Sequence, residues 1–264
     1  MAAISWRKWP DPLVDFGREL YIPWQLASGK VLYRDIACLF GPFSQYLNAL
    51  WFKLFGVSLS TLIFCNLAIL AGMTILIYRL LADATDRLTA TTAGLTLLLL
   101  FAFSEYTTIG NYNFVCPYSH EATHGTALAV AMIFCLSKTE THLPGLMHLL
   151  AGLCLGFVML TKAETSLAAC AVVVVWLILC VLVRPPRARF NTRLTLVLLL
   201  ATAVPMVGFF GTDPRYGKKI MDWIKDEYED AKQIGYEPLK DGRFGIKILK
   251  RRAAAAPASV PSTR

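Results

Sequence analysis

The sequence predicts an all-α, multi-pass transmembrane helix bundle. It also predicts an amphipathic interfacial helix in the first extracytoplasmic loop and a small soluble C-terminal tail. Hydrophobic residues make up 56% of the 264 residues and charged residues only 17%. The mean hydropathy is +0.51, which is too apolar for an ordinary soluble domain. Several apolar runs also approach the length of about 20 residues that a helix needs to cross a bilayer.

The first segment, 1–57, contains an amphipathic stretch at 43–55 that is bounded by Gly41-Pro42 and Gly56. Proline near a first turn and glycine after a last turn are typical helix boundaries. We therefore expect a helix that lies in the membrane interface. Its apolar residues at helical spacing are Phe43, Tyr46, Leu47, Leu50, Trp51, Leu54 and Phe55, while Ser44, Gln45, Asn48 and Lys53 fall elsewhere.

Six apolar runs between 58 and 211 are the expected membrane spans. They are apolar all round, as helices buried in lipid and in a bundle are. The third run is short, and several others are nearer 18 residues than 24, which is typical of tilted or partial spans. The runs are 59–82, 88–104, 125–137, 144–161, 165–183 and 194–211.

The short loops between these runs differ in charge. The loops 105–124 and 162–164 hold one cation, Lys162, and the other set holds seven. The positive-inside rule places the richer set in the cytoplasm and puts 1–57, 105–124 and 162–164 together on the opposite side. This topology explains the net charge of +8, so we expect no nucleic-acid partner. The seven cations are Arg79, Arg87, Lys138, Arg184, Arg187, Arg189 and Arg193.

The tail 212–252 is soluble in character. The pattern predicts a helix over roughly 213–232, followed by a short strand "FGIKIL" at 244–249. The last residues, 253–264, are of low complexity and are expected to be disordered.

Cysteine spacing excludes a zinc ribbon or a thioredoxin-like site, because none of the seven cysteines forms a C-x-x-C pair. Cys38 and Cys116 fall in loops that the topology places on one side of the membrane. A disulfide between them is left open by this placement.

Residues 120–124 read H-E-x-x-H, with His120, Glu121 and His124. On a helix this spacing can hold zinc, with the glutamate activating a bound water. However, Ser119 is a good N-cap, which puts the motif in a first turn, and no third ligand is evident. We therefore expect no metal and interpret both histidines as lining a polar cavity. A zinc-dependent membrane protease is the alternative.

Two carboxylates, Asp15 and Glu19, share a face if the first segment is helical, because they are four residues apart. A carboxylate at a membrane boundary can accept the proton of an acceptor hydroxyl. The alternative is that both are solvated surface charges.

The region 9–183 resembles the GT-C glycosyltransferases, which are multi-spanning, use polyprenyl-phosphate sugars and include the protein O-mannosyltransferases and the aminoarabinose transferase of lipid A. The later stretch "GLCLGFVMLTKAE" is similar to a span end of that family, with Lys162 as its lysine. The tail's "DGRFGIKILKRR" is similar to the end of such proteins. The matching residues of the first loop are Asp15, Trp24, Leu26, Gly29, Tyr33, Arg34, Asp35, Gly41, Pro42, Phe55 and Gly56.

The resemblance implies transfer of a sugar, with inversion, from a polyprenyl-phosphate carrier to a glycan, lipid or protein acceptor on the extracytoplasmic face. Asp15 would be the general base, with Glu19 as a second catalytic carboxylate, and Arg34 and Lys162 would bind the phosphate. No cofactor is expected. The other expected substrate-binding residues are Asp35, His120 and Glu164.

The expected location is the plasma membrane of a bacterium, with the endoplasmic reticulum as the alternative. Two departures from the family pattern leave a third hypothesis open. Many relatives have two adjacent acids where Asp15 is followed by Phe16, and relatives carry more spans than this sequence does. A truncated, non-catalytic remnant is therefore a further alternative.

Overall fold

A computed structural model describes residues 16–104, 113–140, 143–182, 192–210, 228–235 and 245–251. The chain divides into two compact units, Met1–Thr212 and Asp213–Arg264. The division lies next to the boundary at 211 that the sequence analysis drew. The described part of the first unit is helical apart from its turns and one isolated bridge between Leu32 and Ile36.

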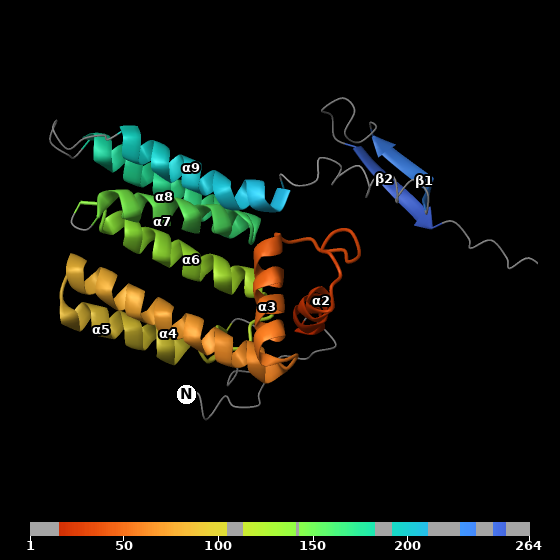
Figure 1. Ribbon diagram of the computed structural model, residues 1–264, viewed down its shortest axis with the longest axis horizontal. Coiled ribbons are helices and arrows are strands. Elements are labelled where there is room, and N and C mark those ends of the chain that lie inside the picture. Colours follow the sequence, from red (N-terminus) through yellow and green to blue (C-terminus); the bar gives the residue numbers. More distant parts are fainter. Residues whose placement is uncertain are drawn as a thin grey trace, which may run out of the picture. The chain divides into compact units, whose positions relative to one another are not determined.

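Each of the six predicted apolar runs lies mainly within one helix of α4 to α9. In Figure 1 these helices run alongside one another, and α3 lies across their ends, with α2 beside it. The helices are α2 Gly17–Ala27, α3 Pro42–Phe55, α4 Leu59–Ala84, α5 Arg87–Thr96 with a π-helical continuation Leu97–Phe101, α6 His120–Ser137, α7 Pro144–Met159, α8 Ala163–Leu182 and α9 Thr192–Phe210.

Two of these helices, α4 and α8, are long and apolar enough to cross a membrane by length and composition. Shorter apolar helices occupy Arg87–Phe101, Pro144–Met159 and Arg193–Gly208. Helix boundaries follow local chemistry: the hydroxyl of Ser58 accepts from the backbone N–H of Ser60 at the start of α4. Asp86 accepts from two backbone N–H groups at the start of α5.

Helix α3 confirms the predicted boundaries, because it begins at Pro42 and ends before Gly56, whose φ is +88°. Its two faces are reversed relative to a helix of a soluble protein. Ser44, Gln45 and Asn48 are buried, whereas Leu54 and Phe55 are 60% and 65% exposed. The polar residues of α3 therefore lie on its inner side together with Ala49 and Phe52, and Leu54 and Phe55 are left for an apolar surrounding.

Helices α7 and α9 pack with almost no space between their backbones. A Cβ atom added to Gly152 would lie 2.2 Å from the carbonyl oxygen of Leu198, and one added to Gly156 would lie 2.4 Å from that of Thr202. Glycines four residues apart on one helix face permit this close approach, as in helix pairs within membranes. Leu198 also belongs to the apolar core that α6, α7, α8 and α9 share.

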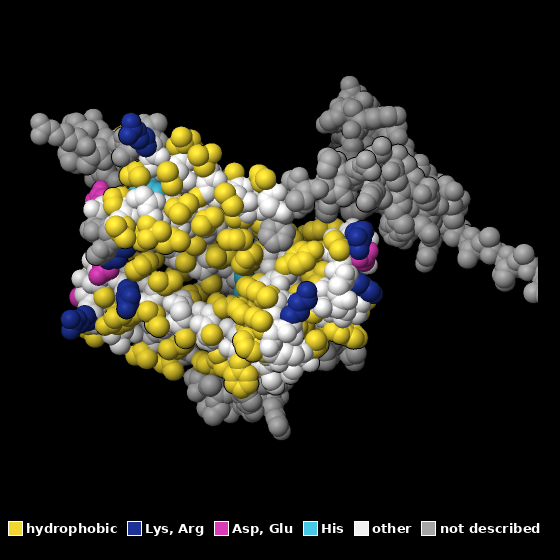
Figure 2. Space-filling view, viewed as in Figure 1, with side chains coloured by type: hydrophobic (Ala, Val, Ile, Leu, Met, Phe, Trp, Pro, Cys, Tyr) yellow, Lys and Arg dark blue, Asp and Glu magenta, His cyan; other side chains and the backbone are white. Residues whose placement is uncertain are grey.

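Large apolar side chains cover much of the outside of the bundle. Leu167 is 74% exposed, and Leu88 and Leu182 are similarly open. Figure 2 shows hydrophobic side chains spread over the visible face of the helices. Charged and amide groups such as Glu19 and Gln45 are buried instead. An outer surface this apolar is a feature of proteins that associate with membranes.

The described part of the second unit is an antiparallel hairpin of β1 Tyr228–Gly235 and β2 Gly245–Arg251. Strand β2 confirms the strand predicted at 244–249. The helix predicted over 213–232 is wrong over 228–232, because those residues pair with β2. Backbone pairing with β2 outweighs local helix propensity over these residues. Residues 213–227 and 253–264 lie outside the described residues.

Candidate functional site

Three segments that are distant in the sequence meet at one end of the bundle: α2 with α3, the start of α6, and the turn between α7 and α8. The backbone N–H of Gly41 donates to the carbonyl of Thr161 at 2.8 Å, and that of Phe43 donates to Leu160 at 3.0 Å. Gly41 allows this contact, because a Cβ atom there would lie 2.1 Å from the Leu160 carbonyl oxygen. The loop charges predict that these segments share one side of the membrane, which would permit this contact.

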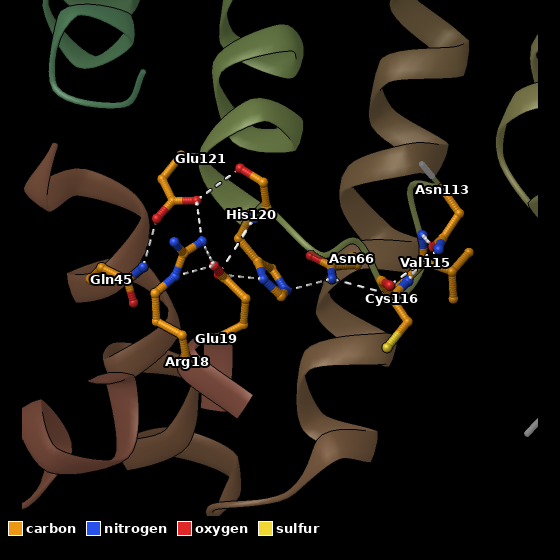
Figure 3. Close-up of polar contacts among 10 residues, drawn as sticks. Arg18, Glu19, Gln45, Asn66, Asn113, Val115, Cys116, His120 and Glu121 are labelled. Atoms are coloured by element: carbon orange, nitrogen blue, oxygen red, sulfur yellow. Dashed lines mark hydrogen bonds and ion pairs between the residues drawn. The ribbon is translucent and has the colours of Figure 1, made fainter. Parts of the chain in front are cut away.

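Glu19 is the centre of a buried polar cluster at this end (Figure 3). Its Oε2 atom lies 2.9 Å from Nδ1 of His120, and it also accepts from the backbone N–H of His120 at 3.4 Å. Its Oε1 atom accepts from Nη2 and Nε of Arg18 at 2.5 and 3.2 Å. The side chain of Glu19 is 0% exposed, so its charge is compensated entirely by these neighbours.

The neighbours of His120 define which ring nitrogen carries the proton. Its Nε2 atom lies 3.0 Å from Nδ2 of Asn66, and the same Nδ2 donates to the carbonyl of Val115 at 3.1 Å. Because an amide nitrogen only donates, Nε2 of His120 is an acceptor. The proton of the neutral ring then lies on Nδ1, where it is donated to Glu19.

A second buried carboxylate, Glu121, lies beside the first. Its Oε1 accepts from Nε2 of Gln45 at 2.8 Å, and its Oε2 accepts from the hydroxyl of Ser119 at 3.0 Å. Nη2 of Arg18 lies 3.8 Å from Glu121 and 2.5 Å from Glu19. One guanidinium is therefore shared by two carboxylates, as Figure 3 shows.

The two carboxylates differ in their affinity for protons. Burial opposes ionisation of Glu19, but the hydrogen bond from His120 and the hydrogen bond and charge of Arg18 together outweigh burial and lower the pKa of Glu19. Burial, followed by repulsion from Glu19, raises the pKa of Glu121, which precedes the apolar part of α6. The cluster therefore holds its negative charge on Glu19 and takes up a proton first on Glu121.

Two cations lie over one aromatic ring beside this cluster. The guanidinium carbon of Arg18 is 4.6 Å from the centroid of the Phe40 ring, and Nζ of Lys162 is 5.6 Å from the same centroid. Their side chains are 37% and 22% exposed. This is the accessible part of the site, and its chemistry suits an anion.

Of the other residues that the sequence singled out, Arg34 and Asp35 pair with each other, and Glu164 lies beside Lys162. Arg34 and Asp35 form an exposed ion pair at 2.8 Å. The hydrogen bond from Arg34 is the main reason that the pKa of Asp35 falls to about 2. Glu164 is exposed at the start of α8, 3.8 Å from Lys162. Asp15 lies outside the described residues.

The H-E-x-x-H motif does not assemble a zinc site in the described part of the chain. Both ring nitrogens of His120 are engaged, one by Glu19 and the other by Asn66. No group of three His, Cys, Asp or Glu side chains among the described residues is placed to hold a metal ion. Zinc sites need at least three protein ligands, so this geometry does not fit the metal.

The cysteine pairing left open by the sequence does not occur, because Cys38 and Cys116 are both free thiols. Cys116 is buried, and its backbone N–H donates to Oδ1 of Asn113 at 2.6 Å.

Sequence reasoning missed Arg18, Gln45 and Asn66 as members of the cluster. For Asn66 a signal was present, since a lone amide in an apolar run must find a buried partner. For Arg18 the signal was its position next to Glu19, which is weak because neighbouring charges are common on surfaces.

No protein-family model, curated protein or solved structure matches the chain.

Proposed function

We propose that the chain is a multi-pass membrane glycosyltransferase of GT-C type, which moves a sugar from a polyprenyl-phosphate carrier to an acceptor on the extracytoplasmic face. The observation that carries this proposal is the convergence of Arg18 and Lys162 on Phe40. The two cations come from segments that the resemblance assigns to the active face. A lipid phosphate needs paired cations of this kind at the membrane boundary.

The arrangement of the helices supports the membrane part of the proposal. Five apolar helices lie alongside one another together with α6, and two of the five are long enough to cross a bilayer. Helix α3 crosses their ends with Leu54 and Phe55 facing outward. In an interfacial position these side chains would contact lipid while the polar face of α3 covers the site.

Arg18 retains hydrogen-bonding capacity for a phosphate. Its hydrogen bonds to described residues use Nε and Nη2, both toward Glu19, and a guanidinium has five N–H groups. Binding of two carboxylates fixes its plane in advance, which lowers the entropic cost of holding a ligand. Lys162 adds a second positive charge over the same ring.

In the proposed reaction Asp15 takes the proton of the acceptor hydroxyl. The acceptor oxygen attacks the anomeric carbon of the sugar, and the bond from that carbon to the phosphate oxygen breaks. The phosphate leaves with its electron pair, and Arg18 and Lys162 stabilise the growing charge. Glu19 is buried, so we assign it the role of positioning Arg18 rather than contacting substrate.

The test is transfer by the full-length protein in proteoliposomes that contain polyprenyl-phosphate-linked sugars, with release of polyprenyl phosphate as the readout. Lys162→Met should lower kcat by about 100-fold or more, the effect of losing one group that stabilises transition-state charge. Lys53→Met is the matched control, because Lys53 is an exposed lysine of α3, and it should retain activity.

Asp15→Asn should abolish transfer while leaving binding of the carrier intact. Equal activities of Lys162→Met and Lys53→Met would remove the proposed phosphate site. Absence of turnover in the wild-type protein with every carrier supplied would favour the non-catalytic remnant.

A further inference from the structure

Four buried side chains of α3 and α6 carry polar atoms that have no hydrogen-bond partner in the described part of the chain. They are Oγ of Ser44, Oε1 of Gln45, Nδ2 of Asn48 and both ring nitrogens of His124. All four side chains are buried, and none of these atoms has a hydrogen-bond partner among the described residues. Buried polar groups in proteins are nearly always paired, so a group of five unpaired atoms indicates a missing partner.

These atoms belong to two elements in direct contact. Ser44, Gln45 and Asn48 are all buried on α3, and Asn48 neighbours both others because it is four residues after Ser44 and three after Gln45. Nε2 of Gln45 donates to Glu121, which is three residues before His124 on α6. The ring of Phe43 also meets the ring of His124 edge-on, with centroids 6.3 Å apart.

We propose that α3 and α6 enclose a binding site for neutral hydroxyl groups, supplied by ordered water or by a carbohydrate. The unpaired atoms require a ligand that both donates and accepts. Nδ2 of Asn48 can only donate, Oε1 of Gln45 can only accept, and Ser44 and neutral His124 can do both. A hydroxyl group or a water molecule meets both demands at once.

A charged ligand does not fit the same set of atoms. An anion would be repelled by the amide oxygen Oε1 of Gln45, and a cation would be repelled by the N–H groups on Nδ2 of Asn48. Among the described residues, His124 has ring contacts with Phe43 and His120 but forms no ion pair. Burial without an acidic partner keeps its imidazole neutral.

The two sources of hydroxyl groups make different demands on α3. Ordered water fits the closed arrangement, in which His124 is almost completely buried. A carbohydrate would require α3 to move away from α6. This proposal does not depend on the sugar-transfer reaction, because it rests on the unpaired atoms alone.

The test is nitrogen-15 NMR of the full-length protein in detergent with labelled histidine. The sequence has four histidines, so the substitutions His124→Phe and His148→Phe assign both signals. His148 is the matched internal control, because its Nδ1 lies 2.7 Å from the carbonyl of Pro144. If the His124→Phe protein fails to fold, the signal is assigned by elimination from substitutions at the other three histidines.

With no sugar added, water in the site should give both nitrogens of His124 the shifts of hydrogen-bonded atoms, unchanged by D-mannose or D-glucose. Saturable movement of the His124 signals with a monosaccharide, but not with glycerol, would identify carbohydrate as the source. Shifts of free, unbonded ring nitrogens under all of these conditions would overturn the proposal. So would a hydrogen bond from His124 to a protein group.

Discussion

Glu19 of α2 and His120 of α6 are 101 residues apart in the sequence and share a hydrogen bond of 2.9 Å between Oε2 and Nδ1. Asn66 of α4 contacts the other side of the same ring. One imidazole therefore links three helices. Arg18, which pairs with Glu19, extends from this cluster to the accessible part of the site. Changes in this buried cluster should affect stability and the position of Arg18 together.

Glu19→Gln should lower the free energy of unfolding by about 3 kcal/mol, the usual cost of removing one member of a buried ion pair. The substitution leaves the guanidinium of Arg18 without its main partner and removes an acceptor from His120. Denaturation in detergent would measure the change. A loss of less than about 0.5 kcal/mol would show that the pair contributes little net stability.

Glu121→Gln should not lower the free energy of unfolding at pH 7, in contrast to Glu19→Gln. Burial and the charge of Glu19 raise the pKa of Glu121, so its ionised form is costly, and a neutral amide of the same shape relieves that cost. The new side chain can still accept from Gln45. We expect unchanged or increased stability. An equal loss in Glu19→Gln and Glu121→Gln would contradict the unequal ionisation of the pair.

The pH dependence of stability should separate the two carboxylates. The pKa of Glu19 is lowered in the folded state, so its contribution is present above the unfolded value of 4.5 and is lost as the pH falls through the folded pKa. The pKa of Glu121 is raised, so its contribution is present below 4.5 and is lost as the pH rises through the folded pKa.

Unfolding curves from pH 3 to 8 should therefore differ between the two variants. Compared with the wild type, Glu19→Gln should lose less stability as the pH falls into the acid range. Glu121→Gln should lose less stability as the pH rises above 4.5. If both variants kept the wild-type profile, neither carboxylate would titrate differently on folding.

Gly41→Ala should weaken the attachment of α3 to the bundle. The added Cβ would lie 2.1 Å from the carbonyl oxygen of Leu160, so the backbone must shift and the hydrogen bond to Thr161 would break. Overpacking of this kind costs about 1–3 kcal/mol or more. Gly72→Ala in α4 is the control, because no atom lies within 4 Å of its added Cβ.

Thermal unfolding of the two glycine variants in detergent tests this contact. Gly41→Ala should unfold at a lower temperature than the wild type, and Gly72→Ala at the same or a higher one. Similar midpoints for both would show that the turn at 160–161 adapts to a methyl group.

Gly152→Ala and Gly156→Ala should separate α7 from α9. Each added methyl would lie within 2.4 Å of a carbonyl oxygen of α9. The control is Gly208→Ala in α9, where no atom lies within 4 Å of the added Cβ, and this substitution should be tolerated. Cysteine cross-linking between α7 and α9 would report their separation, and unchanged cross-linking yields in the two α7 variants would argue against the close contact.

Much of the fold follows from pattern alone. Apolar runs predicted the helices α4 to α9, and Pro42 and Gly56 marked the ends of α3 because their backbone preferences are local. The loop charges predicted only that α3 and the turn at Leu160 share one side of the membrane, and not that they are in contact. These predictions depend on length, hydropathy and turn chemistry, which a sequence contains directly.

The details of the site depend on packing that a sequence does not contain. Nothing local to Arg18 tells that it lies between Glu19 and Glu121, because Glu121 comes from another helix. The tail is a second case in which local sequence does not reveal the tertiary partner. Residues 228–232 have local helix propensity, and only the partner strand makes them extended.

The hydrogen bond from Gly41 to Thr161 also affects the order of events during synthesis. A ribosome that adds roughly 5–20 residues per second needs about 6–24 s to reach residue 161 after residue 41 has been made. Throughout that interval α3 can pack against α2 and α4, but its contact with the turn at 160–161 cannot form. Helix α3 is therefore synthesised well before the turn at 160–161 that it contacts, which gives chaperones and proteases time to act on it.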